Sequence, residues 1–232
     1  MASVIMVVFF SLRSPEVMLG LPYTEATDMW SVGCVAAFLY LGCLLYPGRS
    51  EYDMMRYIVE TQGHPPNTLL TLGLKTGCFF QRNSKNSFWK LKTPEQFYRE
   101  TGIWPLETRS NKFCSLYHLL PIQPIRSEKS VDIVSESTGR LYFGDILSRM
   151  LELDAAKRLT PRQVLQHPFT SMHHMSRRYH VSSYVRSCFE TVYQNRTTDS
   201  GIAVGGSLQR SSSSAHRVQQ NLPSASAERG AC

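Results

Sequence analysis

A run of seventeen residues without a charge constrains the fold of this chain more than any other feature. It covers residues 30–46 and reads WSVGCVAAFLYLGCLLY. Its length lies at the lower edge of what crosses a bilayer, so length alone does not separate a membrane span from a helix buried in a protein core. Thr27 and Asp28 can cap a helix before the run, Pro47 and Gly48 end one sharply, and no basic cluster or aromatic belt brackets it. We therefore expect a central buried helix, and no membrane association is favoured.

The composition is that of a folded domain with one core. Of the 232 residues, 42% are hydrophobic and 19% are charged, which predicts that most of the chain folds. Lys and Arg number 25 against 18 Asp and Glu, and the formal net charge of +7 falls short of a nucleic-acid-binding stripe. The six cysteines form no CxxC pair, which favours a reduced protein of the nucleus or cytoplasm. His173, His174 and His180 lack a nearby cysteine pair, so solvated imidazoles are a better interpretation than a zinc site.

Helical periodicity returns after the uncharged run. Ser50 is expected to begin an amphipathic surface helix, in which Tyr52, Met55 and Val59 share one face and which ends at residues 63–66. Residues 143–151 repeat the helical period, and a further helix is predicted to begin at Thr160.

The remaining segments carry weaker patterns. Turn signals interrupt residues 68–140, which predicts a long irregular insert. Residues 197–232 are rich in Ser with few large apolar side chains, so a disordered tail is expected there. The first ten residues are apolar but match a signal peptide incompletely.

Four motifs occur in a specific order: RSPEVMLG from Arg13, then DMWSVGC, LYPG and LDAAKRLTPRQVLQHPF. This succession resembles the carboxy-terminal half of a eukaryotic protein kinase. The phrases LGLPY, EYD with TQG, LKTPE and VRSCF, together with the long insert, are similar to the homeodomain-interacting protein kinases over roughly residues 13–195. The resemblance implies a mainly α fold, a protein-kinase-like C-terminal lobe fragment with a long irregular insert and a disordered C-terminal tail. Residues 1–12 would be an apolar leader outside the family, 13–169 the kinase part and 170–196 a family-like extension.

The resemblance also assigns roles to residues near the start of the match. Arg13, Ser14 and Pro15 match the end of the activation segment, where in related kinases the arginine receives a phosphotyrosine. No tyrosine precedes Arg13 here, so a solvated arginine is preferred. Glu16 and Arg158 match residues that form a buried ion pair, with two exposed, unpaired charges as the alternative.

Asp28, Trp30 and Gly33 match the start of the family's central helix. In the family the aspartate braces the catalytic loop, whereas a helix cap is the preferred role of Asp28 in this chain. Tyr52, Met55 and Val59 match a docking surface of many kinases, and ordinary core packing of the same face is an equal alternative.

Phosphoryl transfer from ATP to Ser or Thr is the activity that the resemblance implies. It needs a Gly-rich loop, a lysine, Mg²⁺ held by Asp and Asn, and an Asp that receives the substrate proton. The chain contains no GxGxxG, VAIK, HRD or DFG. We therefore expect a fragment that is not catalytic alone and holds no cofactor, ATP and Mg belonging to the full family domain.

Other functions remain open from the sequence. The partners that the resemblance implies are protein substrates or transcriptional co-regulators. The alternatives are a substrate- or scaffold-binding module without catalysis and an incomplete gene model of an active kinase. A small membrane protein is a weaker alternative.

Overall fold

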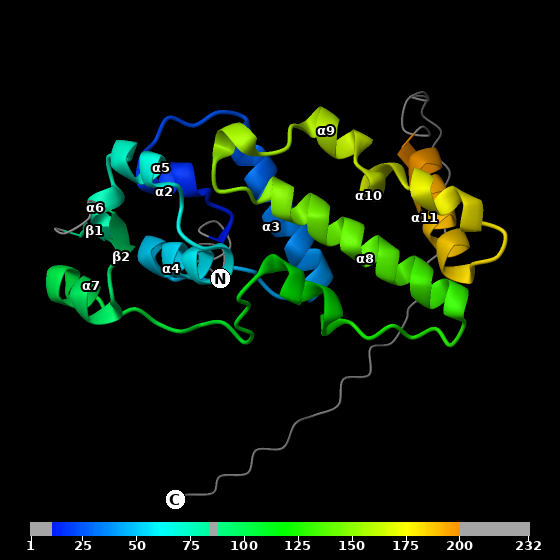
Figure 1. The fold of residues 1–232 in the computed structure, drawn as a ribbon, viewed down its shortest axis with the longest axis horizontal. Coiled ribbons are helices and arrows are strands. Elements are labelled where there is room, and N and C mark those ends of the chain that lie inside the picture. Colours follow the sequence, from blue (N-terminus) through cyan, green and yellow to red (C-terminus); the bar gives the residue numbers. More distant parts are fainter. Residues whose placement is uncertain (1–10, 84–87, 200–232) are drawn as a thin grey trace, which may run out of the picture. The chain divides into compact units, whose positions relative to one another are not determined.

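The computed structural model describes residues 11–83 and 88–199, of which 195–199 are described by their backbone alone. The chain divides into two units, Met1–Glu190 and Thr191–Cys232. Helices dominate the described residues, which also contain one two-stranded sheet (Figure 1). In chain order the elements are α2 (Pro15–Leu19), α3 (Ala26–Leu41), α4 (Glu51–Gln62), α5 (Asn67–Leu72), α6 (Thr76–Phe79), β1 (Phe80–Arg82), β2 (Trp89–Leu91), α7 (Pro94–Thr101), η1 (Leu116–Ile122), α8 (Ser130–Met150), η2 (Ala155–Lys157), α9 (Pro161–Gln166), α10 (Pro168–Ser171), η3 (His173–Arg178) and α11 (Ser183–Asp199).

The uncharged run forms the central helix α3, but the helix ends before the run does. Gly42 follows its last turn with φ 72°, the left-handed conformation that glycine adopts at low cost, and its amide bonds to the Phe38 carbonyl at 2.8 Å. Residues 43–46 therefore lie beyond the helix. Glu25 occupies the N-cap position, so the predicted start at Thr27 and Asp28 was wrong by a few residues.

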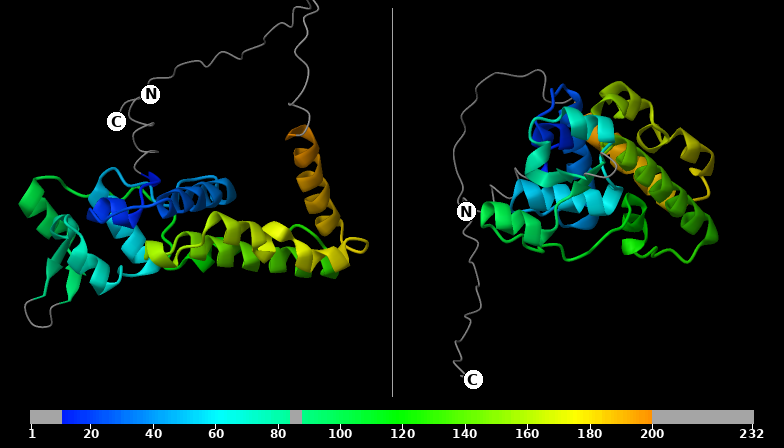
Figure 2. Two further views of the ribbon diagram at one scale, coloured as in Figure 1. Left: turned by 90° about the horizontal axis from the view of Figure 1, so that it is seen from above. Right: turned by 60° about the vertical axis from the view of Figure 1, so that its left-hand side comes forward.

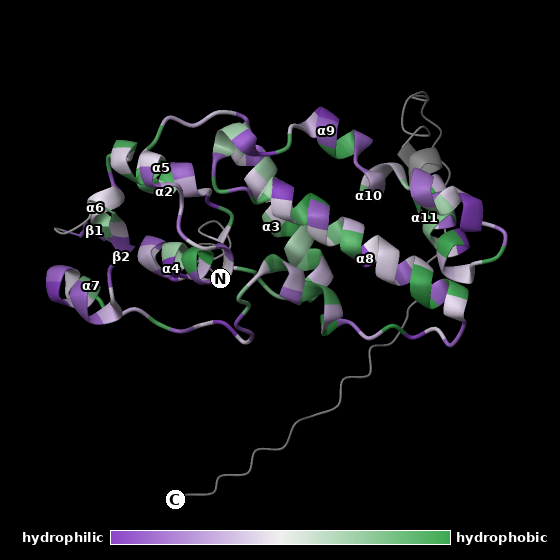
Figure 3. Cartoon of the chain, in the orientation of Figure 1, coloured by the Kyte–Doolittle hydropathy of each residue, from purple (hydrophilic) through white to green (hydrophobic). Residues whose placement is uncertain are grey.

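Helix α3 packs against α8; the two helices cross in Figure 1, and the left view of Figure 2 shows them side by side in two layers. Gly33 permits this close approach, because a Cβ there would lie 2.8 Å from Cδ2 of Leu151. Trp30 is fully buried and its ring stacks on Tyr46 at 6.1 Å between centroids. Apolar and polar residues alternate along α8 (Figure 3), and its second half contributes Phe143, Ile146, Leu147 and Met150 to this core. Sequence periodicity located only the second half of α8, which begins at Ser130.

Helix α4 is a core helix rather than the predicted surface helix. Ser50 caps it as predicted, accepting a hydrogen bond from the Asp53 amide at 3.1 Å. Tyr52 and Met55 are 1% and 0% exposed. The Tyr52 ring stacks 4.1 Å from that of Phe97, which belongs to the segment that follows. The face predicted as a docking surface is thus core, and packing by the insert is the reason.

The insert is more ordered than predicted. Residues 68–140 include most of α5, then α6, the antiparallel pair β1 and β2, α7, η1 and the start of α8. Two of the turn signals in this stretch, at Thr76 and at Thr93, stand at helix starts. Thr93 and Pro94, for example, open α7 with a capping box that Gln96 completes. The prediction of an irregular insert was therefore wrong. It failed because the helices and strands of this stretch are too short to show a period in the sequence.

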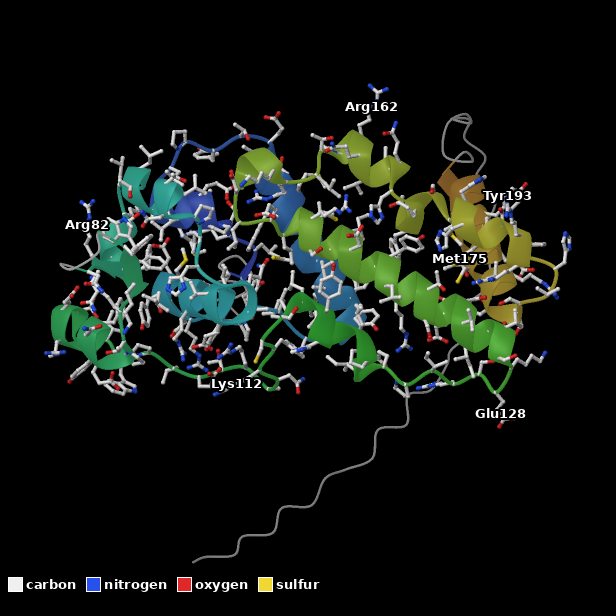
Figure 4. The ribbon with its side chains drawn as sticks, in the orientation of Figure 1. Arg82, Lys112, Glu128, Arg162, Met175 and Tyr193 are labelled. Atoms are coloured by element: carbon white, nitrogen blue, oxygen red, sulfur yellow. The ribbon has the colours of Figure 1, made fainter. Side chains whose placement is uncertain are left out.

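The last elements follow their local signals closely. Thr160, Pro161 and Gln163 begin α9 with a capping box, which confirms the predicted start. Met175 of η3 (labelled in Figure 4) is buried, and a Cβ on Gly139 of α8 would lie 2.8 Å from its Cε. Helix α11 extends to Asp199, so residues 197–199, which were predicted to belong to the disordered tail, are helical. The rest of that tail and residues 1–10 of the predicted leader lie outside the described residues. In the described part of the chain, no helix combines the length and apolar character that a bilayer crossing requires.

Candidate functional site

The start of α2 and the turn after η2 meet through Glu16 and Arg158, although 142 residues separate them. Arg158 Nη1 lies 2.8 Å from Glu16 Oε1, and Nη2 lies 3.0 Å from Oε2. The two parallel bonds make a bidentate guanidinium–carboxylate pair, the geometry that gives arginine its strongest ion pairs. The side chains are 0% and 4% exposed. The sequence-predicted partners are therefore in contact, and the pair is buried.

The hydrogen-bonding capacity of this pair is used in full on the arginine side. Nη1 of Arg158 also donates to the Ala26 carbonyl at 2.6 Å, and Nε and Nη2 donate to the Glu152 carbonyl at 3.1 and 3.0 Å. All five guanidinium N–H groups thus have acceptors. Thr27 Oγ1 donates to Glu16 Oε1 at 3.0 Å, which joins the pair to the first turn of α3. The pair therefore ties together three segments that are distant in sequence.

Charge and burial fix the protonation states around this pair. Burial alone would raise the pKa of Glu16, but the hydrogen bonds and charge of Arg158 outweigh it, and the pKa lies below 4.5. Burial raises the pKa of the nearby Cys34 thiol to about 12, so Cys34 is a neutral core residue. The Arg158 guanidinium also lies 5.3 Å from the Trp30 ring centroid. The cluster holds structure together and offers no nucleophile.

Arg13 lies just before this cluster and is part of an ion pair. The prediction that Arg13 is a solvated, unpaired arginine was therefore wrong. Arg13 Nη1 contacts the Glu51 carboxylate in the first turn of α4. The two side chains are 39% and 29% exposed, so water screens the pair. Ser14 and Pro15 are buried at the start of α2. The sequence carried no signal for Glu51 as a partner, because the choice depends on how α2 packs against α4.

Asp28 is an exposed residue in the first turn of α3 and is not its cap. The predicted cap was wrong because the helix begins at Ala26. A carboxylate in the first turn still interacts favourably with the positive end of the helix dipole. Trp30 and Gly33 lie on the buried side of α3.

Two cavities lie near this region. One, of about 350 Å³, adjoins Glu16 and has a mostly apolar lining of Leu21, Pro22, Thr24, Leu69, Leu72, Leu153, Asp154, Ala155 and Ala156. Another, of about 480 Å³, is lined by Thr61, Gln62, Gly63, Cys114, Ser115, Leu116, Tyr117, Ser148, Glu152 and Leu153. Neither lining contains a lysine or arginine that could bind a phosphate. Among the described residues no three His, Cys, Asp or Glu side chains are grouped to hold a metal. Of the described residues, those that line these two cavities do not fit a Mg–nucleotide complex.

Sequence analysis missed a polar cluster around Asp132, near the start of α8. Its carboxylate accepts hydrogen bonds from the Ser182 and Ser183 hydroxyls, both at 2.5 Å, and from the Tyr184 amide at 3.3 Å. These hydrogen bonds, with the Ser182 bond contributing most, hold the pKa of Asp132 well below its ordinary value. The cluster attaches the start of α11 to α8. No local pattern in either segment indicates the other.

A second missed cluster surrounds Tyr57 of α4. The Arg109 guanidinium lies 4.1 Å from the Tyr57 ring centroid and pairs with Glu60 and Glu107. The Tyr57 hydroxyl donates to the Leu106 carbonyl at 2.7 Å. These contacts attach the loop after α7 to α4. Arg109 stands in a segment with no periodicity, so sequence gave no signal for it.

Comparison with known proteins gives a match to the protein kinase domain family over residues 6–170. Homeodomain-interacting protein kinase 2 of Mesocricetus auratus is 45% identical over 182 residues, which cover 78% of this chain and 16% of that protein. Homeodomain-interacting protein kinase 1 of Mus musculus is 45% identical over 182 residues, which cover 78% of this chain and 15% of that protein. Homeodomain-interacting protein kinase 4 of Homo sapiens is 36% identical over 180 residues, which cover 74% of this chain and 29% of that protein. The chain spans less than a third of the length of these relatives.

Proposed function

Since the chain belongs to the protein kinase family, with the homeodomain-interacting protein kinases as relatives, we propose that it supplies the substrate-side, carboxy-terminal half of a Ser/Thr kinase domain. The observation that supports this role is the buried pair of Glu16 and Arg158. The pair fixes residues 13–16, which match the end of an activation segment, onto the helices that follow. A fixed segment end is what a kinase needs to present a protein substrate in one orientation.

We further propose that these 232 residues do not transfer phosphate by themselves. The sequence contains no Gly-rich loop, no VAIK lysine, and neither HRD nor DFG. In the kinase reaction these motifs supply the groups that neutralise the phosphate charge and receive the substrate proton. ATP and Mg²⁺ would then be bound only where another polypeptide segment supplies those groups. We also propose that the protein resides in the nucleus or the cytoplasm.

Calorimetric titration of the purified chain with Mg–ATP tests this proposal, with the intact kinase domain of a relative as the positive control. We expect no saturable heat, together with a cooperative thermal transition that establishes that the chain is folded. Transfer of radiolabel from ATP to a serine peptide by the same sample would refute the proposal. So would saturable binding in the micromolar range.

A second candidate function is a non-catalytic binding module for homeodomain proteins, after the relatives' printed name. The supporting observation is an exposed apolar patch at the end of α7 and just after it, where Tyr98, Ile103 and Trp104 are 47%, 57% and 52% exposed. The Tyr98 and Trp104 rings lie 5.4 Å apart in an edge-to-face contact. Exposed aromatic residues of this kind are enriched where proteins bind one another.

A pull-down with a purified homeodomain protein tests this second candidate. The Trp104→Ala chain should lose most binding, whereas Leu74→Ala, which alters a side chain that is 91% exposed elsewhere, should retain it. Equal binding by the two variants, or no binding by the unaltered chain, would remove this candidate.

A further inference from the structure

The cavity of about 480 Å³ lies where three segments that are distant in sequence meet. They are the end of α4 with the glycine after it, the start of η1 with the two residues before it, and the end of α8 with the residues just after it. Seven of the ten lining residues have polar side chains: Thr61, Gln62, Cys114, Ser115, Tyr117, Ser148 and Glu152. The volume is that of a small-ligand site, and the lining calls for a polar ligand.

Glu152 is the only charged residue in this lining. Its carboxylate accepts one hydrogen bond, from the Asp154 amide at 3.4 Å. Within the described ranges this carboxylate forms no ion pair. The cations that follow it in sequence have other partners, since Lys157 pairs with Asp154 and Arg158 pairs with Glu16. The lining therefore carries one negative charge that the described residues leave unpaired.

The backbone holds Glu152 in place. Its carbonyl oxygen accepts hydrogen bonds from Nε and Nη2 of Arg158 at 3.1 and 3.0 Å. Its neighbours Leu151 and Leu153 are buried, with 0% and 8% of their surface exposed. A carboxylate on a fixed backbone loses little conformational freedom when it binds a ligand, so this residue is well placed to bind one.

Two neutral groups of the lining use hydrogens inside the protein and keep acceptor oxygens. The Ser148 hydroxyl donates its hydrogen to the Asp145 carbonyl at 2.8 Å, so its oxygen can only accept further bonds. Gln62 Nε2 donates to the Tyr46 hydroxyl at 2.8 Å, and the amide oxygen of Gln62 is an acceptor. Acceptors around a single carboxylate are complementary to a cation that carries several N–H groups.

We propose that this cavity binds a guanidinium group, carried by a free organic cation or by an arginine side chain of a peptide. The Glu152 carboxylate accepts two parallel N–H bonds from the planar group, a geometry that an alkylammonium does not offer. The oxygens of Ser148 and Gln62 are acceptors for its remaining N–H groups. The inference does not depend on the proposed kinase function.

Alkylation of the cysteines in the full chain tests the proposal. Cys114 lines the cavity and is exposed, whereas Cys78 is exposed in α6, outside the lining. N-acetylarginine amide should slow the reaction of Cys114 with iodoacetamide in a saturable manner and leave that of Cys78 unchanged, as measured by peptide mass spectrometry. N-acetylcitrulline amide, which has a similar shape without the charge, should give no protection. Equal protection by agmatine supports a free cation as the ligand, and protection by the arginine amide alone supports a peptide side chain.

The replacement Glu152→Gln tests the role of the carboxylate. It removes the charge but keeps the carbonyl oxygen that binds Arg158, so the circular dichroism should not change. The arginine amide concentration that gives half protection of Cys114 should rise by about tenfold or more, because a charge-assisted pair is lost. The matched control Glu190→Gln alters an exposed carboxylate of α11 and should leave this concentration unchanged.

Three results would overturn the proposal. They are equal protection of Cys114 and Cys78, protection by the citrulline amide, and unchanged protection in Glu152→Gln. The comparison of the arginine and citrulline amides uses the unaltered chain, so it decides the question even where a variant folds poorly.

Discussion

The replacement Glu16→Gln is expected to lower the free energy of unfolding by about 3–5 kcal/mol. The amide keeps the shape of the side chain but removes the counter-charge of Arg158, whose side chain is 0% exposed. The two bonds of 2.8 and 3.0 Å lose their ionic acceptor, whereas the carbonyl acceptors at Ala26 and Glu152 stay in place. The cost is high because the guanidinium remains charged in a place that water does not reach.

Urea unfolding followed by circular dichroism measures this loss. With a slope of about 2 kcal/mol per molar urea, the midpoint should fall by roughly 1.5–2.5 M. The matched control is Lys157→Ala, beside Arg158 in sequence. The Lys157 ammonium lies 3.3 Å from the Asp154 carboxylate, and the Lys157 side chain is 69% exposed. Its removal should therefore lower the free energy of unfolding by only about 0–1 kcal/mol. The double change Glu16→Leu with Arg158→Met should recover most of the loss, because no buried charge is then stranded.

The same pair predicts a pH dependence. The folded pKa of Glu16 is lowered relative to its ordinary value of 4.5. Its contribution to stability is therefore fully present above that value and is lost as the pH falls through the folded pKa. The stability difference between the unaltered chain and Glu16→Gln should shrink below about pH 4.5. A single variant as stable as the unaltered chain at neutral pH, or a double variant no better than the single one, would refute the reasoning.

Three further outcomes are expected. Gly33→Ala should lower the free energy of unfolding by about 1–3 kcal/mol, because the added methyl group would press on the end of α8. Gly77 has open space around it, so Gly77→Ala should be nearly neutral in the same urea assay. Asp132→Asn should speed amide exchange in the first turn of α11, since the carboxylate that accepts its hydroxyl and amide hydrogen bonds is gone; unchanged exchange would argue against that role. The hydrogen bond from Arg109 lowers the pKa of Glu107 to about 2, so the contribution of Glu107 to stability is present above about pH 4.5 and is lost towards pH 2. Trp104 fluorescence should report that acid transition, and Glu107→Gln should weaken it.

Local signals predicted the ends of several helices correctly. Ser50 and Thr160 each accept a hydrogen bond from a backbone amide three residues later, so the start of a helix depends on very few residues. The same kind of signal is present at Thr93 and Gln96, but it lies within the stretch that was predicted to be an irregular insert. Short elements contain too few turns to display a period, and this explains why the insert was described as irregular.

The sequence by itself determined that this chain is mainly helical, that α3 is its central apolar helix, and which family it belongs to. It also pointed to Glu16 and Arg158 as partners, through a resemblance and not through any local pattern. Only the tertiary structure decided that Tyr52 and Met55 are core residues, that Arg13 pairs with Glu51, and that Asp132 of α8 binds the start of α11. Caps and periods act within a few residues of the chain, whereas burial and ion pairing depend on which segments meet in space, and no short stretch of sequence specifies that.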